Sequence, residues 1–109
     1  MSLIDKSITE IKNDKVMSVG VGAFYGCSAL TAVDLPNVAS VGETAFMSCS
    51  SLSAVNLPNA TSIGEGAFAY ISTSAVINLG AAEGEIEGAP WGAPEGITIN
   101  YNVKSIPEE

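Results

Sequence analysis

The chain has 109 residues, of which 47% are hydrophobic and 15% are charged, and its formal net charge is -8. This length suits one domain, so we expect residues 1-109 to share a single core. The 11 glycines and 5 prolines leave no apolar run long enough for a membrane helix, and 12 acids against 4 bases do not suit a surface that follows nucleic-acid phosphates. Histidine, the commonest general base and metal ligand, does not occur. We therefore expect no catalytic residue, cofactor or metal, and no partnership with nucleic acid or insertion into a membrane.

The amino terminus does not read as an export signal. The segment MSLIDKSITEIKNDK mixes three acids with three lysines, whereas a secretory signal needs a basic region followed by an apolar one. If Met1 is the native start, this predicts a cytoplasmic or virion-associated protein. If the chain is truncated, a secreted or cell-surface location is open.

A unit of 22 residues repeats along the chain. Because so short a unit cannot enclose its own apolar face, successive units must stack and share one core. Earlier and later residues keep the same spacing, with Ile11 aligned on Val33, and Ile99 on Ile77. The three clearest copies are SVGVGAFYGCSALTAVDLPN from Ser18, SVGETAFMSCSSLSAVNLPN from Ser40 and SIGEGAFAYISTSAVINLG from Ser62. We expect about five coils, namely 8-29, 30-51, 52-73, 74-96 and a partial 97-109, with 80-96 rebuilt as a capping segment.

Each repeat divides into two halves. Residues 30-35, LTAVDL, alternate apolar and polar side chains as a half-buried strand does, so stacked copies predict a parallel sheet. Pro36 and Pro58 follow and suit the end of a strand. The other half, GETAFMSC, opens with Gly42, where a positive φ is cheap, and is read as a short 3₁₀ or helical turn that drives Phe46 inward. The expected fold is an α/β solenoid with a parallel sheet on one face and short 3₁₀ or helical turns on the other.

Two further features concern the core. Cys27 and Cys49 occupy one column of the repeat whose third member is Ile71, which predicts a ladder of buried thiols, and a disulfide between neighbouring coils is the alternative. Trp91, in GAPWGAP, is expected to plug the end of the core in place of the phenylalanine column. An exposed ring that stacks on a ligand is the other interpretation of Trp91.

A polar column is the best candidate for a binding surface. In the strand pattern the intervening residues face outward, so the exposed sheet should display Thr31, Ala75 and a column preceded by Lys12. Such a row of hydrogen-bonding groups could match an extended peptide or a glycan, or its amides could bond one another and merely solvate the sheet. Tyr25 and Tyr70 are the best aromatic contacts on the outer wall. The column consists of Asp34, Asn56, Asn78 and Asn100.

The acidic carboxy-terminal section offers little chemistry. Glu83, Glu85 and Glu87 invite a calcium hypothesis, but a calcium site needs six to eight oxygens around one point, so a solvated run of charges is the simpler interpretation. Catalysis by a pair of carboxylates needs a cleft, which a flat stacked sheet lacks. We therefore expect that the protein is not an enzyme.

The pattern S-V-G-x-x-A-F-x-x-C-S-x-L-x-x-V-x-L-P-N resembles the BspA-like class of leucine-rich repeats, and residues 8-79 carry it. The resemblance implies a non-catalytic solenoid whose sheet face binds a protein or surface glycan, often in bacterial cell-surface adhesion. The opening segment is similar to short members encoded by phages and prophages, which implies as an alternative a tail-associated structural or receptor-binding component that forms homo-oligomers. Asn37 lies one place short of the usual asparagine position, so the asparagine ladder of common leucine-rich repeats is not expected.

Overall fold

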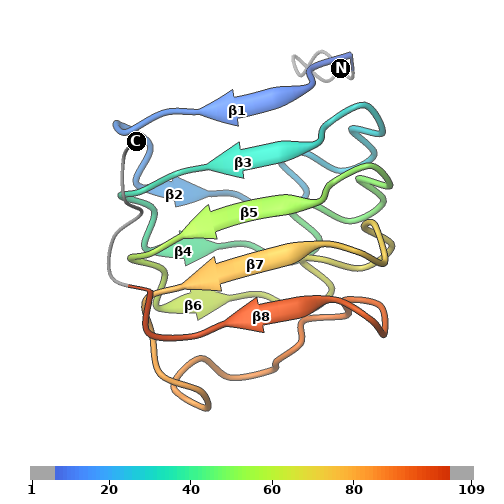
Figure 1. Cartoon of the computed structure of the whole chain (residues 1–109). Coiled ribbons are helices and arrows are strands. Elements are labelled where there is room, and N and C mark those ends of the chain that lie inside the picture. Colours follow the sequence, from blue (N-terminus) through green and yellow to red (C-terminus); the bar gives the residue numbers. More distant parts are fainter. Residues whose placement is uncertain (1–6, 104–109) are drawn as a thin grey trace.

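A computed structural model describes residues 7–103 and shows a stack of coils with two parallel sheets (Figure 1). The front sheet has five strands in the order β1-β3-β5-β7-β8, joined by four turns of the solenoid, and the back sheet has three in the order β2-β4-β6. The strands are β1 (Glu10–Lys12), β2 (Ser18–Val19), β3 (Ala32–Asp34), β4 (Ser40–Val41), β5 (Ala54–Leu57), β6 (Ser62–Ile63), β7 (Val76–Leu79) and β8 (Thr98–Asn100).

The register of the front sheet follows the sequence repeat. Ile11 pairs with Val33, and Val55 pairs with Ile77, which in turn pairs with Ile99. The pairing confirms the expected alignment across the rebuilt segment as well as within the clear repeats. Because alternate side chains of a strand point to opposite faces, this register directs one apolar column into the core. The central members of that column, Val33, Val55 and Ile77, are buried.

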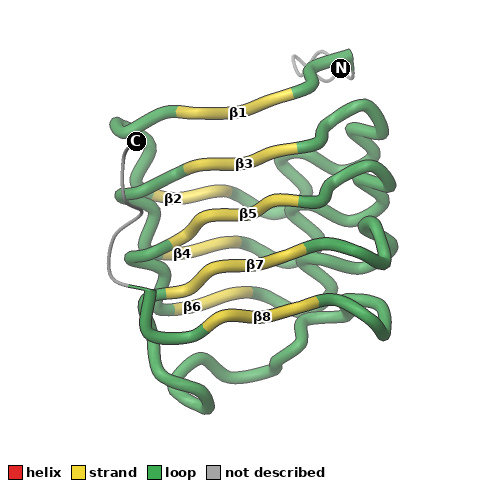
Figure 2. The backbone as a smooth tube through the Cα atoms, in the orientation of Figure 1, coloured by secondary structure: helices red, strands yellow, loops and turns green. Residues whose placement is uncertain are grey.

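The prediction of helical turns opposite the front sheet is wrong. Residues 7–103 contain no helix, and the chain instead forms the back sheet and a turn wall, which we define as residues 21–26, 43–48 and 65–70 (Figure 2). Amides alternate in direction along this wall. Phe24 N donates to Ala45 O of the next coil at 2.8 Å, whereas Tyr25 N donates within its own coil to Gly22 O at 3.1 Å. A helix would direct every amide along its own axis and leave none to join the coils.

Left-handed residues explain why the wall is not helical. Gly22, Thr44 and Gly66 form one column with φ of 63°, 54° and 70°. A second column, four residues later in each coil, consists of Gly26, Ser48 and Tyr70, with φ of 76°, 65° and 62°. A right-handed helix requires negative φ throughout, so two such residues per coil exclude one.

The glycine column that contains Gly42 and Gly64 recurs for a different reason from the one expected. Gly42 does not have a positive φ. A Cβ built on Gly42 would lie 2.5 Å from Val21 N and 2.7 Å from Gly20 C. Gly64 meets the backbone of Glu43 in the same way. These glycines are therefore required because the backbones of adjacent coils approach each other closely.

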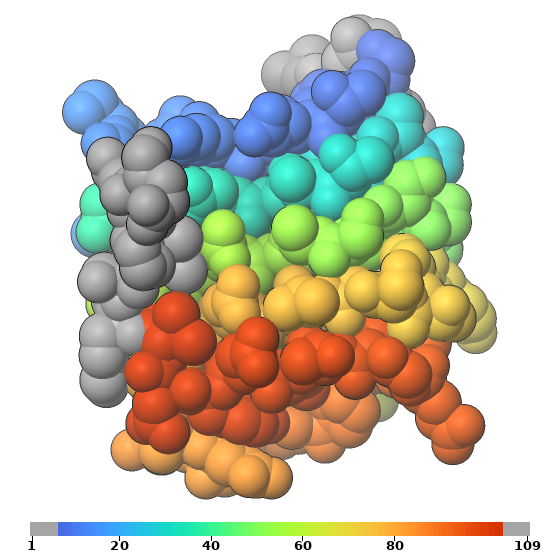
Figure 3. Space-filling model, in the orientation of Figure 1, coloured from blue at the N-terminus to red at the C-terminus, as the bar shows by residue number. Residues whose placement is uncertain are grey.

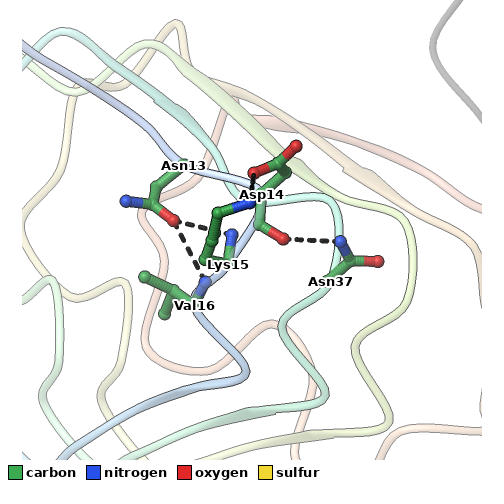
Figure 4. Close-up of polar contacts among 5 residues, drawn as sticks. All are labelled: Asn13, Asp14, Lys15, Val16 and Asn37. Atoms are coloured by element: carbon green, nitrogen blue, oxygen red, sulfur yellow. Dashed lines mark hydrogen bonds and ion pairs between the residues drawn. The ribbon is translucent and has the colours of Figure 1, made fainter.

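Asparagines also join the coils at the corner that follows each front strand. Asn37 Nδ2 donates to Asp14 O at 2.7 Å, and Asn59 Nδ2 donates to Pro36 O at 2.7 Å. In the first coil Asn13 Oδ1 accepts from the amides of Lys15 and Val16 and so shapes the corner itself (Figure 4). These two asparagines therefore each link their coil to the preceding one, with side chains that are exposed at the corner.

Within residues 7–103 the two ends of the core differ in burial. Phe24, Phe46 and Phe68 stack with ring centroids 5.4 and 5.7 Å apart, and Phe46 and Phe68 are buried as expected. Phe24, in the first coil, is only partly buried. At the other end Trp91 is buried, which confirms that this ring plugs the core. The two ends of the solenoid therefore present different surfaces.

Candidate binding surface

The outer face of the front sheet is an open surface of short side chains (Figure 3). Its described residues fall into two columns that run across the strands. One column is small and mostly apolar, and the other is polar. The small column consists of Ala32, Ala54, Val76 and Thr98, and in β1 the same register position is occupied by Glu10. The polar column consists of Lys12, Asp34, Asn56, Asn78 and Asn100.

The three asparagines of the polar column form a chain of hydrogen bonds. Asn78 Nδ2 donates to Asn56 Oδ1 at 2.6 Å, and Asn100 Nδ2 donates to Asn78 Oδ1 at 2.9 Å. The structure therefore brings these predicted residues together, in the arrangement where the amides bond one another. Each amide has two N–H groups and an oxygen with two lone pairs, so each asparagine retains hydrogen-bonding capacity toward the outside. We call Asn56, Asn78 and Asn100 the amide ladder.

The charged residues of the polar column continue its register. Asp34 pairs with Asn56 on one side and with Lys12 on the other. Within residues 7–103 no ion pair links Lys12 to Asp34, and Lys12 is exposed. Asp34 is half-buried, so a negative group lies in the polar column directly beside the amide ladder.

One predicted member of this face lies elsewhere. Ala75 is fully buried, whereas the strand pattern placed it outside. It precedes β7, and its amide bonds Ser72 O at 3.2 Å in a turn, so the alternation of the strand does not extend to it. The equivalent residues Thr31 and Ser53 retain exposed surface. In this coil the outer face of the sheet therefore begins at the next residue, Val76, which belongs to the small column.

The two predicted tyrosines lie apart from the amide ladder. Tyr25 and Tyr70 are 50% and 72% exposed, so both rings are accessible as expected. Both belong to the turn wall and not to a strand of the front sheet. They also occupy different columns, because Tyr70 aligns with Gly26 in the repeat and Tyr25 aligns with Met47. The structure thus does not unite them into one aromatic surface.

The acidic section is a turn-rich cap. Glu85 Oε1 accepts from Ala82 N at 2.7 Å and so supports a local turn. Within the described part of the chain no three His, Cys, Asp or Glu residues are grouped to hold a metal ion. Glu65 and Glu87 contribute with Trp91 to a shallow pocket at the capped end. The pocket was not predicted from the sequence, although Glu43, Glu65 and Glu87 share the spacing of the repeat.

The cysteine column is part of the core. Cys27 and Cys49 are both fully buried and do not form a disulfide, which confirms the ladder of buried thiols. Cys49 Sγ lies 3.1 Å from Phe24 O and donates a hydrogen bond to it. The residue in the next coil, Ile71, is also buried. The column is therefore structural, and its atoms do not reach the surface.

Comparison with known proteins identifies the repeat. Residues 4–88 match the family described as the BspA type leucine rich repeat region, in 6 copies. No curated protein and no solved structure gives a significant match. Among residues 7–103 no helix is long and apolar enough to cross a bilayer. The matched region covers most of the chain, and the structure is a solenoid with the same repeat. The chain therefore belongs to the BspA-type leucine-rich repeat family.

Proposed function

We propose that this protein is a non-catalytic binding module and that the outer face of its front sheet binds an extended protein segment. The observation that carries the proposal is the amide ladder, with its two hydrogen bonds of 2.6 and 2.9 Å. An exposed, regularly spaced row of amides on a rigid sheet offers one polar contact for each coil. The acids of the front sheet, Glu10 and Asp34, lie on this open face, which does not enclose a substrate as a carboxylate-pair enzyme must.

The ladder suits recognition because its side chains are already ordered. A side chain that is fixed before binding loses little conformational entropy when a ligand arrives. Neighbouring strands are about 4.8 Å apart, so the outward hydrogen-bonding groups repeat at that distance along the stack. The adjacent small column, Ala32, Ala54 and Val76, allows a backbone to approach closely. An extended peptide that lies across the strands can use both columns together.

The proposed binding is weak for each copy of the protein. Hot spots of protein interfaces favour Trp, Tyr and Arg, and the chain has no Arg. The exposed tyrosines Tyr25 and Tyr70 belong to the turn wall, and Tyr101 packs against the core. Several copies that act together would gain affinity through a high effective concentration. This requirement is consistent with an adhesion or recognition role at a cell surface, where many copies are displayed. A phage tail-associated component would also satisfy it, and a stable homo-oligomer in solution would favour that alternative.

The test uses a library of random peptides and an array of glycans, each probed with the whole chain coupled to multivalent beads. We expect peptides to be selected, and we expect their NMR titration against the single chain to shift amide signals of β3, β5, β7 and β8. Ala54→Arg places a long charged side chain in the small column without removing an amide of the ladder. This substitution should weaken binding of the selected peptides by about tenfold.

Ser50→Arg is the matched control because Ser50 is exposed near the turn wall and lies outside the front sheet. It should leave peptide binding unchanged. Selective capture of glycans, with no peptide selected, would show that the ligand is a carbohydrate and not a protein. Signal shifts confined to Tyr25, Tyr70 and their neighbours would overturn the assignment of the front sheet.

A further inference from the structure

The first strand of the front sheet is an edge strand with an unusual sequence. β1 reads Glu10, Ile11, Lys12, and no other strand of the described chain lies outside it (Figure 1). We propose that two copies of this chain join head to head through this edge, β1 against β1 in antiparallel orientation. The two front sheets would then form one continuous sheet around a two-fold axis through Ile11. This surface is distinct from the face proposed above for peptide binding.

The backbone directions of β1 allow such a pairing. Thr9 O accepts from Thr31 N at 2.8 Å, and Asn13 N donates to Asp34 O at 3.2 Å, so the odd-numbered residues bond toward β3. Because the backbone groups of successive strand residues point to opposite sides, those of Glu10 and Lys12 point away from β3. In an antiparallel pair centred on Ile11, Glu10 faces the partner's Lys12. Both residues of that pair direct N–H and C=O toward each other, as a hydrogen-bonded antiparallel pair requires.

The side chains agree with the same register. Glu10 and Lys12 are exposed on the outer face, and the two-fold axis places each opposite the partner's residue of opposite charge. Two cross-strand ion pairs therefore form for every dimer, and each contributes a modest stabilisation. Ile11 faces the core, is only partly buried, and would meet the partner's Ile11. Any shift of the register by two residues removes this charge matching.

The rest of the same end is apolar and incompletely covered. Val16 and Phe24 are partly buried and pack against the core cluster. Met17, Val21 and Tyr25, all in this first coil, are three of the four large hydrophobic residues that the described chain exposes. In the last coil the positions equivalent to Met17 and Val21 are Glu83 and Glu87. The apolar character is therefore a property of this end and not of the repeat.

The opposite end does not offer an equivalent surface. Trp91 and Ile86 close the core there. Residues 80-103 include four glutamates and no Lys or Arg, so two copies of this end would repel each other. Residues 7-25 contain two acids and two lysines and are neutral overall. Charge and core exposure thus both select the β1 end as the contact between two copies.

Sedimentation equilibrium of the whole chain tests the proposal. We expect a monomer–dimer equilibrium in which Lys12→Glu or Glu10→Lys raises the dissociation constant by about tenfold or more, because each places like charges opposite each other twice. The double substitution Glu10→Lys with Lys12→Glu restores opposite charges and should return the dissociation constant to within about threefold of the original. Circular dichroism melts of the four proteins confirm that each is folded.

A second measurement reports on the register itself. Ile11→Cys places a thiol on the two-fold axis, and mild oxidation should join two chains through it, whereas Asn13→Cys should cross-link much less. Thr98→Glu alters the charge of the opposite edge strand, β8, and should leave the dissociation constant unchanged. A chain that remains monomeric up to millimolar concentration would overturn the proposal. So would a dimer that neither single charge reversal weakens, or one that the double substitution fails to restore.

Discussion

The indole ring of Trp91 meets the ring of Phe68 edge-on, with ring centroids 6.3 Å apart and planes at 71°. The three phenylalanines before it stack with nearly parallel planes, at 8° and 1°. The change from stacked to edge-on geometry marks the end of the column, because the edge of an aromatic ring covers the face of the last phenylalanine. Trp91 Nε1 also donates to Glu87 O at 2.8 Å, so its polar atom is satisfied. The cap is therefore both apolar and hydrogen-bonded.

Removal of the indole should destabilise the whole solenoid. Trp91→Ala deletes a fully buried ring and exposes Phe68, and we expect it to lower the free energy of unfolding by about 3–5 kcal/mol. Trp91→Phe keeps an aromatic ring but loses the bond to Glu87 O, so its cost should be about half of that. Urea denaturation followed by circular dichroism measures both. A loss below about 1 kcal/mol for Trp91→Ala would show that the cap does not close the core.

The close approach of adjacent coils makes a second prediction. Gly42→Ala would place a methyl group against the backbone of Val21 and Gly20, which cannot move without separating the coils. We expect the free energy of unfolding to fall by about 3 kcal/mol. Gly20→Ala is the matched control, because a Cβ there meets nothing within 4 Å. It should leave stability unchanged or raise it by about 0.5 kcal/mol. Equal losses in the two variants would refute the steric explanation.

The sequence predicted the features that depend on apolar periodicity. The register from Ile11 to Ile99 and the burial of Phe46 each follow from one column of the repeat, and the structure confirms them. The reason is that a 22-residue unit must share its core with its neighbours, so a column that is apolar in every coil has to point inward. For the candidate site the same argument gave the amide ladder, because residues in register on adjacent strands are neighbours.

The features that the sequence did not predict depend on backbone conformation. The back strand Ser18–Val19 is too short to show alternation. The sequence of the turn wall was mistaken for a helical turn because Thr44, Ser48 and Tyr70 adopt left-handed φ values without being glycine, the residue that usually indicates them. In the last coil Gly88 and Gly92 again take positive φ, which shows that the cap retains the backbone of the repeat. In the sequence, the glycine pair Gly22 and Gly26 was the available signal for left-handed residues in the turn wall.

The left-handed column allows a stabilising substitution. Ser48 has φ of 65°, where Gly26 and Gly92 occupy the equivalent positions. Ser48→Gly removes the cost of placing a Cβ in this conformation, and after the larger entropy of the unfolded glycine is subtracted we expect a gain of about 0.5 kcal/mol. Ser48→Val should instead lower stability by about 1–2 kcal/mol, because a branched side chain tolerates this φ poorly. Thermal melts distinguish the two signs, and a glycine variant that melts below the parent would contradict the prediction.

The buried thiols give a chemical prediction. Cys27 and Cys49 are fully buried and not disulfide-bonded, so a thiol reagent should not label the folded chain. After denaturation without reductant, two thiols per chain should react. Labelling of one or both thiols in the native state would show that the core opens readily at this column. A reduced total after denaturation would instead reveal a disulfide in the purified protein.

The amide ladder should contribute to stability in proportion to the bonds that each asparagine makes. Asn78 donates to Asn56 and accepts from Asn100, whereas Asn100 takes part in only one of these two bonds. With about 1 kcal/mol for each bond, Asn78→Ala should lower the free energy of unfolding by about 2 kcal/mol and Asn100→Ala by about 1 kcal/mol. The double variant should lose no more than Asn78→Ala alone plus the small packing term of Asn100, because the bond between the two residues is counted once. Urea denaturation of the three variants measures this coupling. Fully additive losses would mean that the two amides are not joined in solution.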